Sequence, residues 1–240
     1  MRRWDPVLVA AAALAAWQAG HWALGEAALV SPAQALARLV VLGGRAAFWA
    51  EAAETGWAFL LSGSLSVAGG VTLGCALGLS RVAGRVTEPL LAAFYALPKV
   101  TLYPVVLLLF GLGGAAKVAF GVMHGMIPIA LVTMAAILQV RPVLLRTGRT
   151  MRLGAAQMAV RIVLPAVLPE VLGGVRIGVP LALLGVLIGE MFASRRGLGS
   201  MAMRAMEVGD GATLLALAVL LSVVAVAVNS ALSRIGSSSA

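Results

Sequence analysis

The stretch RPVLLRTGRTMRLGAAQMAVR (residues 141–161) carries five arginines and is flanked by long apolar segments. Lys and Arg are retained on the cytoplasmic side of a bilayer, so a charged loop of this kind orients the spans that it joins. We therefore expect a cytoplasmic loop over 141–169, between two membrane crossings. It can form two short amphipathic helices that are broken near Gly154 and end at Leu164-Pro165, before the next span. A basic cytoplasmic loop is also a natural docking surface for a soluble partner. The alternative is a basic surface that only contacts anionic headgroups.

The composition outside this loop is that of a membrane protein. Of 240 residues, 61% are hydrophobic and only 11% are charged, whereas a soluble domain carries about 25% charged residues. Runs such as LLALAVLLSVVAVAVNSAL (214–232) do not alternate as the strands of a membrane barrel do. The net charge of +9 lies largely in loops expected on the cytoplasmic side, which argues against a nucleic-acid partner. The sequence predicts an all-α protein of the lipid bilayer.

Six apolar segments are near the length of about 20 residues that a crossing helix needs. They are 6–24, 57–80, 89–110, 116–139, 171–193 and 212–233. With Arg2 and Arg3 inside, alternation of the spans places both termini in the cytoplasm, and the inner loops then hold more Lys and Arg than the outer ones. An uncleaved first span is a simpler interpretation of the N-terminus than a signal peptide.

The chain divides into three parts. Residues 1–56 hold the first span and an outer amphipathic segment, in which Ser31-Pro32 has the form of a helix start. Residues 57–234 form the main membrane domain, and residues 235–240 form a flexible tail. The single cysteine, Cys75, excludes a disulfide within the chain.

Glycines recur at helical spacing in the predicted second and fifth spans. Gly70 and Gly74, Gly74 and Gly78, and Gly174 and Gly178 form GxxxG pairs. Small residues let helices approach closely in lipid. These pairs predict either packing within the chain or a functional surface, namely a dimer face or a sliding surface.

The third predicted span is interrupted by Pro98 and Pro104, and the fourth by Pro128. Proline removes a helix hydrogen bond and kinks the chain, and kinked spans often line a substrate path. Lys99 either snorkels to the inner surface or lines this path and attracts an anion. Glu190 lies well inside the fifth predicted span, where burying a carboxylate costs about 3 kcal/mol. It therefore lines the path, or it lies near the outer interface and is paired with a group such as Arg195.

The sequence carries no catalytic signature. His21 and His124 are isolated in apolar surroundings, and no spacing suits a metal site. No GxxxxGK[ST] string is present, so the chain does not bind ATP in the P-loop manner. We expect no enzyme activity and no bound cofactor.

Three longer strings resemble the permease subunits of bacterial ABC importers of the nitrate, sulfonate, taurine and bicarbonate class. They are SLSVAGGVTLGCALGLS (64–80), EPLLAAFYALPKVTLYPVVLLLFGLGGAAKVAF (88–120) and RIVLPAVLPEVLGGVRIGVPLALLGVLIGEMFASRRGLG (161–199). Within the second, ALP, five residues, Pro and then FGLG before a Lys is typical of the class.

The resemblance implies a type I ABC importer permease of the bacterial inner membrane, with six spans. It further implies a homo- or heterodimer of permeases, a dimeric ATPase that binds ATP and Mg2+, and an extracytoplasmic substrate-binding protein. The expected cargo is a small anion such as nitrate, a sulfonate, taurine or an aromatic acid. The expected path residues are Pro98, Lys99, Pro104 and Glu190.

The same resemblance assigns a coupling helix to the basic loop, where it would lie in a groove of the ATPase. The family pattern is EAA, three residues, Gly, nine residues, then I-x-LP. Residues expected to contribute are Arg146, Arg149, Arg152, Leu153, Gly154, Ala155, Ala156, Ile162, Leu164 and Pro165.

This chain departs from the pattern. Gly148 stands where the Glu is expected, and the helix is two residues short between Gly154 and Ile162. Either the coupling contacts are rebuilt, or the chain is the degenerate half of a heterodimer.

Two other functions compete with this one. A secondary transporter or channel without ATP coupling predicts inverted repeats and charged relays within the membrane. A structural membrane subunit predicts no loss of uptake when residues of the path are changed.

Overall fold

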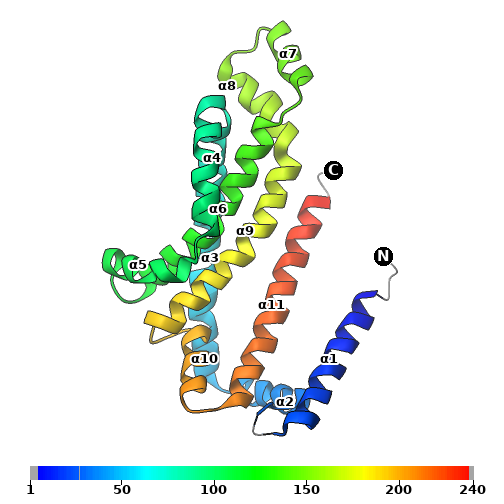
Figure 1. The fold of residues 1–240 in the computed structure, drawn as a ribbon, viewed down its shortest axis with the longest axis vertical. Coiled ribbons are helices and arrows are strands. Elements are labelled where there is room, and N and C mark those ends of the chain that lie inside the picture. Colours follow the sequence, from blue (N-terminus) through cyan, green and yellow to red (C-terminus); the bar gives the residue numbers. More distant parts are fainter. Residues whose placement is uncertain (1–4, 27, 238–240) are drawn as a thin grey trace.

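The computed structural model describes residues 5–26 and 28–237, and within them the chain is helical without a β-strand. Figure 1 shows an elongated bundle. Its elements are α1 (Asp5–Leu24), α2 (Pro32–Gly43), α3 (Ala46–Gly78), α4 (Arg81–Ala96), η1 (Lys99–Leu102), α5 (Tyr103–Phe110), α6 (Gly114–Leu138), α7 (Pro142–Thr150), α8 (Ala155–Met158), η2 (Ala159–Val163), α9 (Leu164–Ala193), α10 (Leu198–Glu207) and α11 (Gly211–Ser237). The all-α prediction is confirmed.

The long axis of the bundle has two distinct ends. The helices α7, α8 and η2, which we call the basic hairpin, lie at one end, and α2 and α10 lie at the other (Figure 1). The start of α1 and the end of α11 both point toward the hairpin end (Figure 1). The helices therefore alternate in direction as the sequence predicted.

Helix α6 is the centre of the bundle and packs along both α3 and α9. Glycines make these contacts close, because a Cβ atom at 70, 74 or 78 of α3 would lie 2.7, 2.6 or 2.9 Å from the Cβ of Ile129, Thr133 or Ile137, respectively. From α9, a Cβ at Gly174 would lie 3.1 Å from the Cβ of Val132. The glycine pairs thus serve packing within the chain, which is the first of the two predicted roles.

Four helical stretches are long and apolar enough to cross a membrane: 46–78, 114–138, 155–193 and 211–234. The pair of helices over 81–96 and 99–110 makes a fifth if it is taken as one broken span. The described apolar part of α1 covers only Leu8–Leu24. The sixth crossing, at 6–24, stays a prediction.

The break predicted at Pro98 in the third span, 89–110, is confirmed: the span is split at Leu97 and Pro98, and the two halves meet at 91°. The break predicted at Pro104 is wrong, because Pro104 lies in the first turn of α5. Proline disfavours the helical conformation of the residue before it, and Leu97 is accordingly extended, with ψ 139°. Arg81 and Arg85, predicted in a loop, lie in the first turns of α4.

The structure also corrects the break predicted at Pro128 and the boundary predicted at 56/57. The helix α6 runs through Pro128 without interruption, so the predicted break is wrong; α3 and α9 enclose this part of the helix, and neighbouring helices make such prolines tolerable. The helix α3 begins at Ala46, so the boundary predicted at 56/57 falls inside it. Residues 46–56 carry charged side chains whose partners, such as Arg204 for Glu51, are distant in sequence.

The two ends of the chain agree with their predictions to different extents. Ser31 caps α2 in a capping box with Gln34, which confirms the predicted helix start. At the other end, α11 extends through Ser237, three residues into the stretch predicted as a flexible tail. Residues 238–240 lie outside the described part of the chain.

The packing of α3 on α6 predicts a contrast between two glycine substitutions. In Gly74→Ala the new Cβ would meet the Thr133 side chain at 2.6 Å, whereas at Gly173 no atom lies within 4 Å. Overpacking costs about 1–3 kcal/mol, while Ala gains about 1 kcal/mol over Gly in an open helix position. Thermal unfolding in detergent should show Gly74→Ala destabilised and Gly173→Ala unchanged or stabilised. Equal midpoints for the two variants would contradict the close contact.

Candidate functional site

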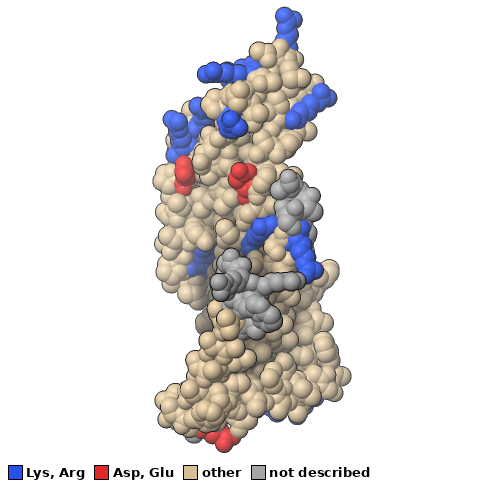
Figure 2. Space-filling model, turned by 90° about the vertical axis from the view of Figure 1, so that its right-hand side faces the viewer, with Lys and Arg blue, Asp and Glu red and all other residues tan. Residues whose placement is uncertain are grey.

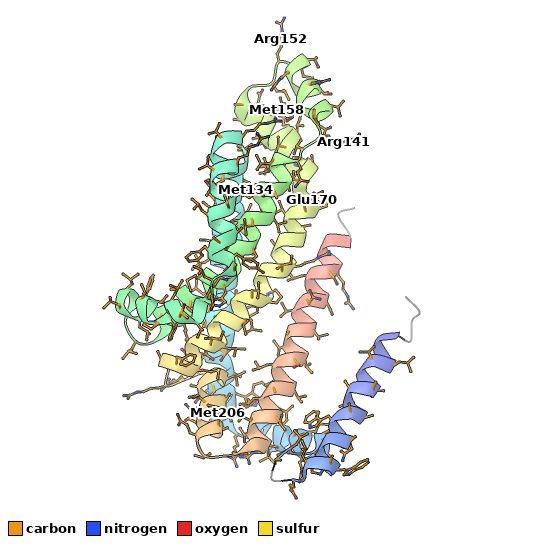
Figure 3. The ribbon with its side chains drawn as sticks, in the orientation of Figure 1. Met134, Arg141, Arg152, Met158, Glu170 and Met206 are labelled. Carbon is orange, nitrogen blue, oxygen red and sulfur yellow. The ribbon has the colours of Figure 1, made fainter. Side chains whose placement is uncertain are left out.

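The basic hairpin extends beyond the ends of α3 and α6. Its five arginines are Arg141, Arg146, Arg149, Arg152 and Arg161, and all are exposed. Figure 2 shows basic side chains gathered at this end of the molecule, and Figure 3 shows Arg152 projecting from its tip. No acidic residue occurs between Glu88 and Glu170, so the hairpin has no carboxylate of its own to neutralise this charge.

The turn of the hairpin is built by a Schellman motif at the end of α7. Arg152 has φ 53°, its N–H bonds the Arg149 carbonyl, and the Leu153 N–H bonds the Gly148 carbonyl at 3.1 Å. Both bonds satisfy carbonyls that the last turn of a helix leaves free. The predicted break near Gly154 is therefore confirmed, and the turn directs the Arg152 guanidinium outward.

The glycine at 148 has a structural reason. It is buried in the hairpin, and a Cβ there would meet the side chains of Met158 and Ile162, the latter at 2.7 Å. A side chain at this position would have to displace the ends of the Met158 and Ile162 side chains. The missing acidic residue therefore coincides with a close contact between the two arms of this hairpin.

The second arm of the hairpin does not stop at Leu164-Pro165, so the predicted stop is wrong. The chain passes through a π-turn, η2, in which the Leu164 N–H bonds the Ala159 carbonyl, and continues as α9. Proline clashes with the carbonyl four residues before it in an α-helix, and a wider π-turn relieves this clash. Residues 155–193 therefore form one helical stretch that joins the hairpin to the far end of the bundle.

That far end holds a second cluster, at the start of α10. The N-cap position is Gly197, which has no side chain to cap the helix. The N–H groups of Gly197, Leu198 and Gly199 instead bond to side chains of other helices. The acceptors are Glu51 and Thr55 of α3 and Glu190 of α9; the Leu198 bond to Thr55 Oγ1 is 2.8 Å and the Gly199 bond to Glu190 Oε2 is 3.0 Å. We call this set the α10 cap.

The α10 cap is charge-balanced by Lys117, from the first turn of α6. The Lys117 ammonium is 2.9 Å from Glu54 Oε1 and 3.2 Å from Glu190 Oε1. Glu190 and Lys117 are almost completely buried, whereas the Glu54 side chain is 39% exposed. Thr55 Oγ1 donates to Glu190 Oε2 at 2.8 Å. The partner of Glu190 is thus Lys117 and not Arg195, and the carboxylate is fully hydrogen-bonded.

Gly197 is required by this geometry. Its φ is +117°, and a Cβ added to it would overlap the Glu190 carboxylate. Glu51, which caps the start of α10, also forms an ion pair of 2.8 Å with Arg204 of the same helix. Carboxylates at a helix N-terminus are favourable because they face the positive end of the helix dipole.

The residues predicted for the path are not gathered at one point. Pro98 and Pro104 are exposed, and the Lys99 ammonium donates to the Tyr95 carbonyl at 3.0 Å and lies 4.8 Å from the centre of the Tyr95 ring. None of the three is a hydrogen-bond partner of Glu190 among the described contacts. The broken span that holds these three residues contacts α9 next to Glu190, where the Tyr103 hydroxyl donates to the Gly189 carbonyl at 2.7 Å. Their role in a path stays a prediction.

An apolar groove of about 940 Å³ lies between α3, α6 and the broken span formed by α4, η1 and α5. Glu54 and Lys117 are the charged groups on its wall, among residues such as Trp57, Phe94 and Met126. The described residues contain no group of three His, Cys, Asp or Glu side chains that could hold a metal ion.

Sequence reasoning missed several of these residues. Lys117 was counted as an ordinary span-edge lysine, and Glu51, Glu54 and Thr55 as part of a loop. Arg176 in α9 was also missed; its guanidinium donates to the carbonyls of Leu232 and Ser233 and so joins α9 to α11. The available signal for the first group was opposite charge at the ends of three spans on one side of the membrane.

Asp210 ties α2 to the start of α11. Burial by itself would raise the pKa of this carboxyl, but hydrogen bonds from Thr213 and the guanidinium of Arg38 outweigh it and hold the pKa below its ordinary value. The Arg38–Asp210 pair is 2.8 Å long and about a third exposed on each side, so solvent screens it and its contribution is below about 1 kcal/mol.

This lowered pKa predicts a pH-dependent contribution to stability. Because the folded pKa of Asp210 is depressed, the contribution is present above the ordinary pKa of 3.8 and is lost as the pH falls through the folded value. Thermal unfolding should therefore show wild type above Asp210→Asn at pH 7, with the difference shrinking at pH 3. A difference that is constant with pH would exclude this linkage.

The Lys117 contacts predict an unequal pair of substitutions. Lys117→Met leaves the buried Glu190 charge unpaired, which costs about 3–5 kcal/mol. Glu190→Gln costs less, because Lys117 retains Glu54 and the amide oxygen still accepts from Gly199. In thermal unfolding, Lys117→Met should be the least stable, and the double variant Lys117→Met/Glu190→Gln should recover part of the loss. A double variant below Lys117→Met would argue against the pairing.

The sequence and the fold were compared with known proteins. Residues 67–237 match the family described as the binding-protein-dependent transport system inner membrane component. Relatives include the taurine transport system permease protein TauC of Escherichia coli (26% identical, 78% of this chain and 72% of the relative). The riboflavin transport system permease protein RibX of Chloroflexus aurantiacus is 30% identical over 77% of this chain and 70% of its own length.

Among solved structures, an inward-facing crystal form of the MetNI methionine ABC transporter has the same fold. Its TM-score is 0.69 at 20% identity, over 78% of this chain and 93% of that chain. The family match covers most of the sequence, and the chain therefore belongs to the inner membrane components of binding-protein-dependent transport systems, the permeases of ABC importers.

Proposed function

We propose that this permease carries a small anionic solute across the bacterial inner membrane and that its basic hairpin docks on an ATPase subunit. In this proposal two permease chains pair as a homo- or heterodimer, the ATPase dimer binds ATP and Mg2+, and an extracytoplasmic binding protein delivers the solute to the α10 end. The hairpin and both termini then face the cytoplasm.

The observation that carries the docking proposal is the continuity of the hairpin with α9. A soluble partner that moves α7 moves the second arm with it, because Gly148 packs directly on Met158 and Ile162. That arm continues through the π-turn into a helix that ends beside the α10 cap. One rigid element thus joins the proposed ATPase contact to the proposed binding-protein contact, as a lever requires.

The absence of the family glutamate fits rebuilt coupling contacts better than a lost function. The position is occupied by packing within the hairpin, and exposed arginines surround it. The charge complementarity of the contact would then be supplied by carboxylates of the ATPase.

The choice of solute class rests on relatives with different cargo. Taurine and aliphatic sulfonates appear in the names of two relatives, and riboflavin, formylaminopyrimidine and glycine betaine or proline betaine in those of others. We propose a small solute with an anionic group because taurine and aliphatic sulfonates share a sulfonate group and recur in the names of the relatives. Coverage does not separate them from the formylaminopyrimidine and betaine permeases, which match over 86% and 83% of the chain. Family membership speaks against the alternative of a transporter or channel that works without ATP.

The docking proposal predicts the outcome of a charge deletion. The triple variant Arg146→Ala/Arg149→Ala/Arg152→Ala removes three exposed guanidinium groups at one face of the hairpin. Each such contact is worth about 0.2–1 kcal/mol, so the loss of three should lower affinity for the ATPase about 3- to 150-fold. Copurification of a tagged ATPase from membranes measures this.

The control is Arg195→Ala/Arg196→Ala, which removes exposed arginines at the opposite end of the bundle. It should leave ATPase copurification unchanged. Normal copurification of the triple variant, together with weaker binding of the hairpin to anionic vesicles, would assign the arginines to lipid headgroups and overturn the docking proposal.

A further inference from the structure

The start of α10 is capped by three side chains that belong to other helices. Its first N–H groups bond to Glu51 and Thr55 on α3 and to Glu190 on α9. The free N–H groups of a helix start are ordinarily satisfied by the N-cap residue itself or by water. Here the N-cap is Gly197, and the site is buried, so neither is available.

This arrangement fixes the mutual positions of α3 and α9. Thr55 Oγ1 both accepts from Leu198 N–H and donates to Glu190 Oε2, each at 2.8 Å. If α3 moved relative to α9 at this end, a buried N–H or a buried carboxylate would lose its partner, which is costly in the absence of water. Lys117 adds α6 to the same block through Glu190.

We propose that Thr55, Glu190 and Lys117 are positioning residues that lock α10 to the three core helices, so that a partner bound to α10 acts on α3, α6 and α9 as one body. Part of α10 is available for such a partner, because Met206 and Glu207 near its end are exposed. Met206 lies at the far end of the molecule from the basic hairpin (Figure 3). The identity of the partner, the extracytoplasmic binding protein, rests on the proposed function.

Charge does not by itself distinguish this role from a site for a passing ion. Every acidic or basic group at the block has a partner within the chain: Glu54 and Glu190 share Lys117, and Glu51 holds Arg204. The carboxylate of Glu190 also accepts two hydrogen bonds, from Thr55 and Gly199. A carboxylate whose oxygens already accept these hydrogen bonds positions its neighbours and is not available to bind a solute.

The test compares two isosteric changes of buried threonines. Thr55→Val removes the acceptor for Leu198 and the donor to Glu190, while the Lys117–Glu190 pair remains. Thr133→Val is the matched control, because Thr133 is fully buried on α6 and its hydroxyl is the one buried side-chain atom without a partner among the described residues. Both variants keep the shape of the side chain.

The first readout is hydrogen exchange of the amides in 195–207, measured on the permease in nanodiscs. Thr55→Val should speed exchange at the start of α10 about tenfold, and Thr133→Val should leave it unchanged. Unchanged exchange in Thr55→Val would overturn the cap as the element that holds α10. This readout needs neither the ATPase nor the binding protein, so it stands or falls independently of the proposed function.

The second readout uses the permease assembled with its ATPase in nanodiscs and the binding protein encoded with it as the probe. In Thr55→Val the concentration of binding protein that gives half-maximal stimulation of ATP hydrolysis should rise about tenfold, while unstimulated hydrolysis and ATPase copurification stay at the level of Thr133→Val. Faster exchange without a change in stimulation would overturn the transmission through α10. Absence of any ATPase from the wild-type complex would instead refute the proposed function.

Discussion

The close approach of α6 to α3 and α9 is the constraint on which the rest of the structure depends. Glycines at 70, 74 and 78 bring the backbone of α3 onto side chains of α6, and Gly174 does the same from α9. In a bilayer, the hydrophobic effect does not favour contact with another helix over contact with lipid tails. Close van der Waals packing therefore decides which helices associate. With α6 held in this position, its first turn places Lys117 between two carboxylates and away from water.

The buried charges follow from that placement and shape the α10 end. Glu190 is stable in the bundle because an ammonium, a hydroxyl and a backbone N–H all face it. The same carboxylate completes the start of a helix that has only glycine at its N-cap. Membrane interiors tolerate ionisable groups that are paired within the bundle. Here the pairing also attaches an outer helix to the core.

The hairpin end of the bundle is shaped by Gly148 and by the π-turn before Pro165. Gly148 allows α7 to lie directly on η2, and the π-turn carries the chain past Pro165 without ending the helix. The hairpin is therefore an extension of α9 and not a separate loop element. Where the family pattern has a glutamate, this chain has a glycine against which the second arm of the hairpin packs. Its arginines are left on the surface.

Sequence alone determined the membrane class, the helical content, the alternating direction of the helices, the Ser31 cap and the basic hairpin, because each depends on local composition or short-range spacing. It also indicated the family from strings such as ALP and FGLG. The sequence predicted the break at Pro98 but neither its 91° angle, the packing at Gly148 nor the continuation past Leu164-Pro165. Tertiary structure also decided the partner of Glu190 and the side chains that cap α10. These depend on residues far apart in the chain: Thr55 lies 135 positions from Glu190, and Lys117 lies 73. Hydrophobic periodicity carries no information about which distant side chain meets a buried charge; helix packing supplies it.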